Sequence, residues 1–148
     1  DLKNPTYRNH KGHQEAVSVR FNPKEITYQK LLRSYWRNVD ALDGAGQFCD
    51  RGDSYRPVIY VRDENQRKDA INSFESAAKE LDQLTENIQV EIQDLKKFWL
   101  AEDYHQDFAN RNQLKYNFYR YSCGRDNRLE ELWGGRARSE KEWANQIQ

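Results

Sequence analysis

The chain has 148 residues, the size of a single domain, and its 24 basic residues balance its 24 acidic ones. Neither sign of charge fills a long block, which argues against nucleic acid or an anionic membrane as the main partner. We expect a soluble protein, because no apolar run is long enough to span a membrane. No signal peptide is visible, so the expected compartment is either the cytoplasm or an organelle whose import removes an N-terminal segment.

The first predicted element is a half-buried strand over residues 16–21, where small or apolar residues alternate with polar ones. The alternation places Glu15, Val17 and Val19 on one face, so the acid stands in line with core side chains. Burial disfavours the charged form of a carboxylate, and we therefore expect Glu15 to hold a proton that it can donate. The alternative is a Glu at the strand edge that turns to solvent, as most Glu side chains do.

A helix is predicted next, capped by Thr27 and running to about Val39. Its apolar residues recur at helical spacing, which is typical of a face that packs into the core. Residues 40–54 then form a loop rich in Gly and Asp, whose length for a compact domain suggests a functional role. The apolar stripe of the helix contains Tyr28, Leu31, Leu32, Tyr35 and Trp36.

Residues 55–62 are predicted to form a second strand, followed by a long helix that Asp63 caps and that ends near Leu81. Strict alternation predicts a third strand over residues 88–92. The coarse order is thus β-α-β-α-β, which indicates the α+β class. The inner face of the long helix is expected to hold Ile71, Phe74, Ala78 and Leu81.

The rest of the chain, residues 94–148, is expected to be a long, irregular, aromatic wrap with one short helix near residues 101–110. We place a domain boundary after residue 134. Residues 135–148 are then a charged tail, either solvated or in contact with a partner.

Two cysteines, Cys49 and Cys123, have no metal-ligand spacing and are too few for a disulfide scaffold. They are buried thiols, a single bridge or redox partners. Asp50 and Asp53 disfavour a thiolate at Cys49, whereas nearby arginines favour one at Cys123. Cys123 is therefore the better candidate for a resolving thiol, with an inert buried cysteine as the alternative. The arginines are Arg120, Arg125 and Arg128.

Several blocks of residues occur in one order that resembles the peptide methionine sulfoxide reductase A family. The resemblance runs from about residue 4 to residue 134. The blocks are residues 4–7 (NPTY), 12–17 (GHQEAV), 46–56 (GQFCDRGDSYR), 101–107 (AEDYHQD), 123–126 (CGRD) and 129–134 (LEELWG).

The resemblance implies a small mixed sheet flanked by helices, in a ferredoxin-like sandwich. It also implies thiol chemistry without a metal or an organic cofactor. In the family, a cysteine thiolate attacks the sulfur of a methionine S-sulfoxide in a protein and becomes a sulfenic acid. A resolving thiol then forms a disulfide, which thioredoxin reduces.

The resemblance also assigns roles to residues. Glu15 matches the acid that protonates the sulfoxide oxygen, and Tyr7 and Tyr55 match two hydroxyls that hold this oxygen. Asp50 matches a carboxylate that assists the later thiol steps. The same motif blocks make His13, Tyr104 and His105 candidate pocket residues.

The chain departs from the family pattern in three respects. It contains no Gly-Cys-Phe-Trp segment, which holds the nucleophile in the family, and the loop between Tyr7 and Gly12 is short. Ala41 also stands where the family commonly has a proline. Two functions follow: a reductase whose N-terminal segment lies outside this sequence, or a non-catalytic descendant that acts as a structural or binding subunit. Without the family's first strand, the sheet and the apolar stripe of residues 28–36 are expected to need cover from that segment or from a partner.

Overall fold

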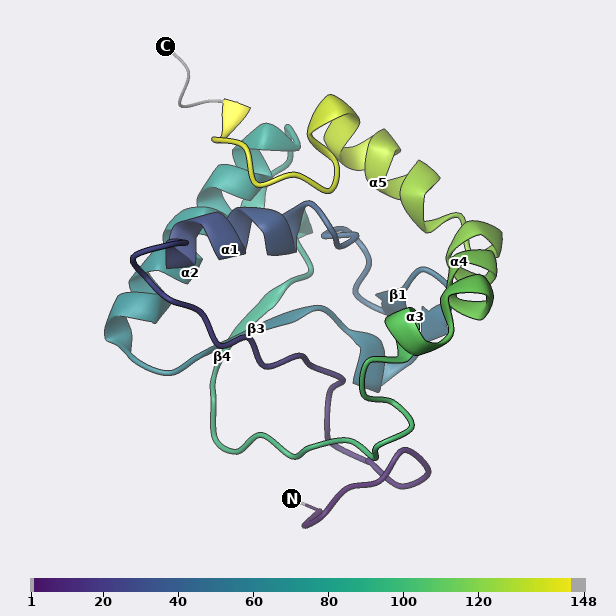
Figure 1. Cartoon of the computed structure of the whole chain (residues 1–148). Coiled ribbons are helices and arrows are strands. Elements are labelled where there is room, and N and C mark those ends of the chain that lie inside the picture. The colour runs from purple at the N-terminus through teal and green to yellow at the C-terminus, as the bar shows by residue number, and fades with distance from the viewer. Residues whose placement is uncertain (1, 145–148) are drawn as a thin grey trace.

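The computed structural model describes residues 2–144, and its centre is a pair of helices packed over a two-stranded sheet (Figure 1). Helix α1 (Tyr28–Trp36) lies beside α2 (Glu64–Glu80), and α2 packs on strands β3 (Val58–Val61) and β4 (Glu91–Asp94). The two strands are parallel, and the helix between them is the connection that parallel pairing requires. Among the described residues, no helix has the length and apolar character needed to cross a membrane.

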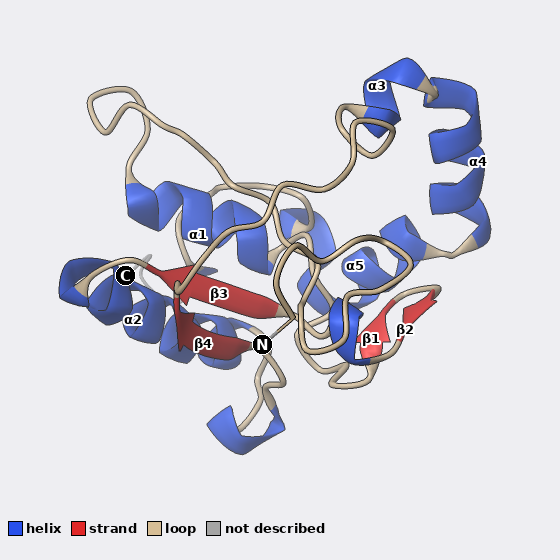
Figure 2. Ribbon diagram, turned by 90° about the horizontal axis from the view of Figure 1, so that it is seen from below, coloured by secondary structure: helices blue, strands red, loops and turns tan. Residues whose placement is uncertain are grey.

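A second, antiparallel pair is separate from the first, as Figure 2 shows. It consists of β1 (Gly46–Gln47) and β2 (Asp50–Arg51). Three helices follow in the C-terminal half: α3 (Phe108–Arg111), α4 (Gln113–Ser122) and α5 (Arg125–Trp133). Short 3-10 helices occur at η1 (Asp53–Tyr55), η2 (Thr85–Asn87) and η3 (Gly134–Arg136).

Helices α1 and α2 confirm the predicted capping residues. The Thr27 hydroxyl accepts a hydrogen bond from the Lys30 amide at 3.2 Å, and the Asp63 carboxylate accepts one from the Gln66 amide at 2.9 Å. The inner face of α2 is shifted from the prediction, since Ile71 is exposed. Small residues of α2 let the two helices approach closely, and they are Ala70, Ser73, Ala77 and Ala78.

The predicted strand over residues 16–21 is wrong. The segment is extended, but it has no strand partner within the described residues, and Val17 and Val19 are 88% and 59% exposed. Alternation describes a strand only where a neighbouring strand takes its backbone hydrogen bonds. The third strand begins later than predicted, at Glu91, because the Gln89 amide donates to the Ala41 carbonyl at 2.8 Å rather than to β3.

The C-terminal half is more helical than expected, with α4 and α5 in a region predicted to be irregular. In α4, Leu114 and Phe118 are 89% and 72% exposed, so the apolar residues of this helix do not mark a buried face. Hydrophobic periodicity reveals a helix through burial, and α4 gives little such signal. The mixed α/β class itself is confirmed.

Residues 137–144 do not form a solvated tail. Trp143 is 4% exposed and packs over the guanidinium of Arg37, 5.0 Å from the ring centroid. The Arg37 guanidinium is fully buried and bonded to the Glu80 carboxylate, and it also donates to the Lys141 carbonyl at 2.5 Å. This segment helps to cover α1: Leu32 and Trp36 are 3% and 0% exposed, whereas Tyr28, Leu31 and Tyr35 of the stripe are partly buried. The expected need for cover from another segment or a partner stays a prediction. Residues 145–148 of the predicted tail lie outside the described residues.

Candidate active site

The site is built around the short hairpin of β1 and β2. Its turn places Phe48 in the left-handed region, with φ at 55°. Gly46 also has a positive φ, and a side chain there would bring a Cβ to 2.2 Å from the Asp50 carbonyl oxygen. A glycine is therefore required for Asp50 to lie where it does, at the start of β2. The chain then turns through η1, which ends at Tyr55.

Glu15 is held next to η1, the turn that contains Tyr55, by a backbone hydrogen bond rather than by strand pairing. The Glu15 amide donates to the Ser54 carbonyl at 2.7 Å. The side-chain amide of the neighbouring Gln14 makes two hydrogen bonds. Its nitrogen Nε2 donates to the Arg56 carbonyl at 3.2 Å, and its oxygen Oε1 accepts from the Tyr60 hydroxyl at 2.8 Å. Glu15 itself is exposed. The expectation of an acid on a buried strand face is therefore wrong, and sequence analysis missed the anchoring role of Gln14.

The N-terminal segment is attached to residues 101–107. The Tyr7 amide donates to the Glu102 carboxylate at 3.1 Å, and the Tyr7 ring lies against His105 with centroids 4.7 Å apart. His105 also contacts the ring of Tyr104, at 4.2 Å. Two motif blocks almost a hundred residues apart in sequence are thus joined, and the Tyr7 ring is packed on one side by His105. Tyr104, a candidate pocket residue, is 57% exposed at the outer side of this contact.

Three candidate residues act electrostatically on a fourth, Tyr55. Partial burial raises the pKa of Tyr55, and the hydroxyl of Tyr7 and the carboxylates of Glu15 and Asp50 raise it further. Negative charge near a phenol disfavours its ionised form, so Tyr55 keeps its proton at neutral pH. Tyr7, Glu15 and Asp50 thus lie close enough to Tyr55 to act on its ionisation, and we call these four residues the acid–hydroxyl cluster.

Tyr119 of α4 also contacts this cluster, and sequence analysis did not identify it. Its hydroxyl donates to Asp50 Oδ1 at 2.5 Å. This hydrogen bond is the main reason that the pKa of Tyr119 rises to about 12, with burial and the charge of Asp50 adding to it. The only sequence signal was the aromatic character of residues 116–121, which is equally typical of a core-covering segment.

Cys49 and Cys123 are joined by a disulfide, with their Cα atoms 5.3 Å apart. A single bridge was one of the three alternatives left open by the sequence. Neither cysteine is a free thiol in this structure. A resolving role for Cys123 or Cys49 therefore requires that this bond first be reduced.

The histidines have backbone and aromatic partners. The His13 ring is 2.9 Å from the Leu2 carbonyl oxygen at its Nε2 atom, and His105 Nε2 is buried with no hydrogen-bond partner among the described residues. Within residues 2–144, no group of three or more His, Cys, Asp or Glu side chains is arranged to hold a metal ion.

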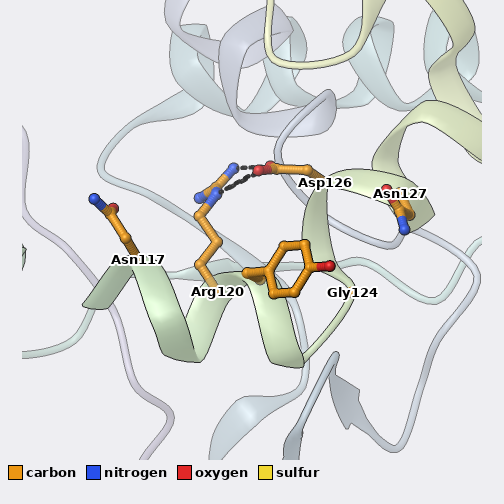
Figure 3. Close-up of a pocket in the computed structure, with 6 residues that line it drawn as sticks. Asn117, Arg120, Gly124, Asp126 and Asn127 are labelled. Atoms are coloured by element: carbon orange, nitrogen blue, oxygen red, sulfur yellow. Dashed lines mark hydrogen bonds and ion pairs between the residues drawn. The ribbon is translucent and has the colours of Figure 1, made fainter. Parts of the chain in front are cut away.

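A separate hollow lies where α4 meets α5 (Figure 3). It is open, and the ion pair between Arg120 and Asp126 crosses it. None of its lining residues belongs to the acid–hydroxyl cluster, so we assign it no part in the chemistry. The lining residues are Asn117, Arg120, Tyr121, Gly124, Asp126 and Asn127.

A family model described as "Peptide methionine sulfoxide reductase" matches residues 1–137. The chain belongs to this family. It is 49% identical over 138 residues to peptide methionine sulfoxide reductase MsrA 2 of Caulobacter vibrioides, an alignment that covers 90% of this chain and 69% of the relative. It is 40% identical over 141 residues to the MsrA/MsrB protein of Vibrio cholerae, covering 90% of this chain and 36% of that protein.

A solved structure of Mxr1 from Saccharomyces cerevisiae in reduced form is also similar, with a TM-score of 0.58 and 27% sequence identity. The match covers 63% of this chain and 50% of the yeast chain. The chain thus spans only part of its relatives: about two thirds of the Caulobacter protein, half of the yeast chain and about a third of the Vibrio protein. It has the fold of these reductases and is a reductase-like protein by family.

Proposed function

We propose that this chain supplies the proton-donating part of a site that reduces methionine S-sulfoxide in proteins. The observation that supports the proposal is that the Glu15 amide is bonded to Ser54, next to Tyr55, and that Tyr7, Glu15 and Asp50 all raise the pKa of Tyr55. A sulfoxide oxygen is a poor leaving group until it is protonated, so the reaction needs an acid and hydroxyl donors beside this oxygen.

The roles follow from the chemistry of each group. Glu15 delivers the proton to the sulfoxide oxygen, while the Tyr7 and Tyr55 hydroxyls hold that oxygen by donating hydrogen bonds. A thiolate attacks the sulfoxide sulfur, the S–O bond breaks, and the oxygen ends on the thiol sulfur as a sulfenic acid. The thiol sulfur is oxidised by two electrons and the sulfoxide is reduced to a thioether. Asp50 assists the later step, in which a second thiol forms a disulfide and water leaves.

The attacking thiol belongs, in this proposal, to a Gly-Cys-Phe-Trp segment outside these 148 residues. Cys49 and Cys123 are not used for the attack, because they are bonded to each other. After that bond is reduced, Cys123 and Cys49 remain candidates for the resolving thiol.

The substrate we propose is an oxidised methionine on a protein surface. The cluster is open to solvent, with Tyr7 53% exposed and Glu15 also exposed, so a side chain presented by another protein can reach it. Thioredoxin is the proposed reductant. His13, Tyr104 and His105 are proposed as the surrounding wall.

A stereospecific assay tests the function. The full-length gene product is incubated with thioredoxin, its reductase and peptides that carry either the S or the R epimer of methionine sulfoxide. We expect reduction of the S epimer alone. N-terminal sequencing of the same protein should locate the Gly-Cys-Phe-Trp segment, and a mature protein that lacks this segment and reduces neither epimer would contradict the proposal. No feature of residues 2–144 favours the alternative, a structural or binding subunit.

A further inference from the structure

The tip of the β1–β2 hairpin is held by a single corner of the C-terminal half, residues 119–125, where α4 ends and α5 begins. Three consecutive residues of the tip each contact this corner. The contacts are the Cys49–Cys123 disulfide, the Arg125 guanidinium 4.6 Å above the Phe48 ring, and the Tyr119 hydroxyl bonded to Asp50.

The hairpin needs such contacts. Its strands have two residues each, and it is not hydrogen-bonded to the β3–β4 sheet. A two-stranded hairpin by itself is at best marginally stable in water. The corner at residues 119–125 therefore contributes to the position of Asp50, in addition to the local turn at Gly46.

Tyr119 is the part of the corner that acts on Asp50 directly. A phenol that donates to a carboxylate forms a charge-assisted hydrogen bond, which is shorter and stronger than a bond between neutral groups. The hydrogen bond from the Tyr119 hydroxyl to Asp50 Oδ1 pairs such a donor with such an acceptor.

We propose that Tyr119 is a positioning residue, which holds the Asp50 carboxylate toward Tyr55 while the disulfide and Arg125 keep α4 on the hairpin. The inference rests on the proposed function, since the role of Asp50 in the thiol steps comes from it. Tyr119 does not touch the sulfoxide; it acts through Asp50 alone.

A double-mutant cycle in the full-length gene product tests this dependence. Tyr119→Phe should lower kcat about tenfold, the scale of one hydrogen bond to a charged group, and leave KM within about twofold. In an Asp50→Asn background the same change should have almost no further effect, because the group it positions is gone. Tyr121→Phe is the matched control, since Tyr121 lies on the same helix and is 84% exposed. Equal losses from Tyr119→Phe in both backgrounds would show a merely structural role and overturn the proposal.

A second readout needs no activity. The absorbance of ionised tyrosine is followed with pH in the 148-residue chain without reductant, and Tyr119→Phe identifies the Tyr119 transition. Asp50→Asn should move this transition to lower pH, because it removes the negative charge that holds the phenol proton. An unmoved transition would overturn the proposal even if the reductase assay succeeds. Loss of reductase activity altogether would contradict the proposed function, while this titration would still decide whether Tyr119 and Asp50 are coupled.

Discussion

Arg37 and Glu80 form an ion pair that is removed from solvent, with the Arg37 side chain 0% and the Glu80 side chain 6% exposed. The guanidinium meets the carboxylate with two nitrogens, each 2.9 Å from an oxygen. The pair joins α1 to α2, and it also fixes the C-terminal segment, since the Ala144 amide donates to Glu80 at 2.9 Å. Replacing one member of so deeply buried a pair is costly, because the charge that remains is neither paired nor solvated by water.

Arg37→Met should therefore lower the free energy of unfolding by about 3–5 kcal/mol, the usual cost of leaving a buried charge unpaired. Urea unfolding of the 148-residue chain measures this loss. The control is Arg67→Met, because Arg67 pairs with the largely exposed Asp94 and should contribute only about 0–1 kcal/mol. Equal losses in the two variants would contradict the role of the buried pair.

The disulfide should stabilise the chain. It closes a loop with a sequence separation of 74 residues, and loss of such a restraint costs about 2–4 kcal/mol. Urea unfolding of the oxidised protein is compared with that of a Cys49→Ala, Cys123→Ala variant. Unchanged stability in the variant would show that the hairpin and α4 stay together without the bond.

Much of the fold could be predicted because helices α1 and α2 are specified locally. Thr27 and Asp63 cap helices whose apolar faces are buried, so both cap and periodicity were visible in the sequence. Helix α4 could not be found this way, because Leu114 and Phe118 face solvent. The strand at residues 16–21 was predicted from alternation alone, which says nothing about whether a partner strand is present.

The candidate site was predictable only in part. The motif blocks named Tyr7, Glu15, Asp50 and Tyr55, and the first three raise the pKa of the fourth in the structure. Neither Gln14 nor Tyr119 could be assigned, because each acts through a contact more than 40 residues away in sequence. Such contacts depend on the tertiary arrangement and leave no local pattern.

Gln14 should matter for activity through the placement of Glu15. Gln14→Leu removes both the bond to the Arg56 carbonyl and the bond from Tyr60, so the segment before Glu15 is less firmly held. We expect kcat/KM of the full-length gene product for the S epimer to fall about tenfold, the cost of one or two hydrogen bonds. Gln113→Leu, an exposed change at the start of α4, is the control. A Gln14→Leu enzyme as active as the control would remove Gln14 from the site.

The pH dependence of the free energy of unfolding should reveal the ionisation of Tyr119. Its pKa in the folded chain is about 12, above the value of 10.0 for a free tyrosine. A raised folded-state pKa stabilises the fold fully below pH 10, and this contribution is lost as the pH rises towards 12. Urea midpoints measured across this interval should thus fall more steeply for the natural chain than for Tyr119→Phe. Parallel curves would show that the hydrogen bond to Asp50 does not contribute in solution.

The central claim is that Glu15 protonates the sulfoxide oxygen, and single-turnover reduction of an S-sulfoxide peptide by Glu15→Gln tests it most directly. The variant of the full-length gene product keeps the size of the side chain and the backbone bond to Ser54 but has no proton to give. We predict that Glu15→Gln lowers the rate about a hundredfold or more, the usual scale for loss of a general acid. The control is Glu86→Gln, which changes an exposed glutamate outside the cluster and should keep the natural rate. A Glu15→Gln rate equal to that of Glu86→Gln would contradict the account.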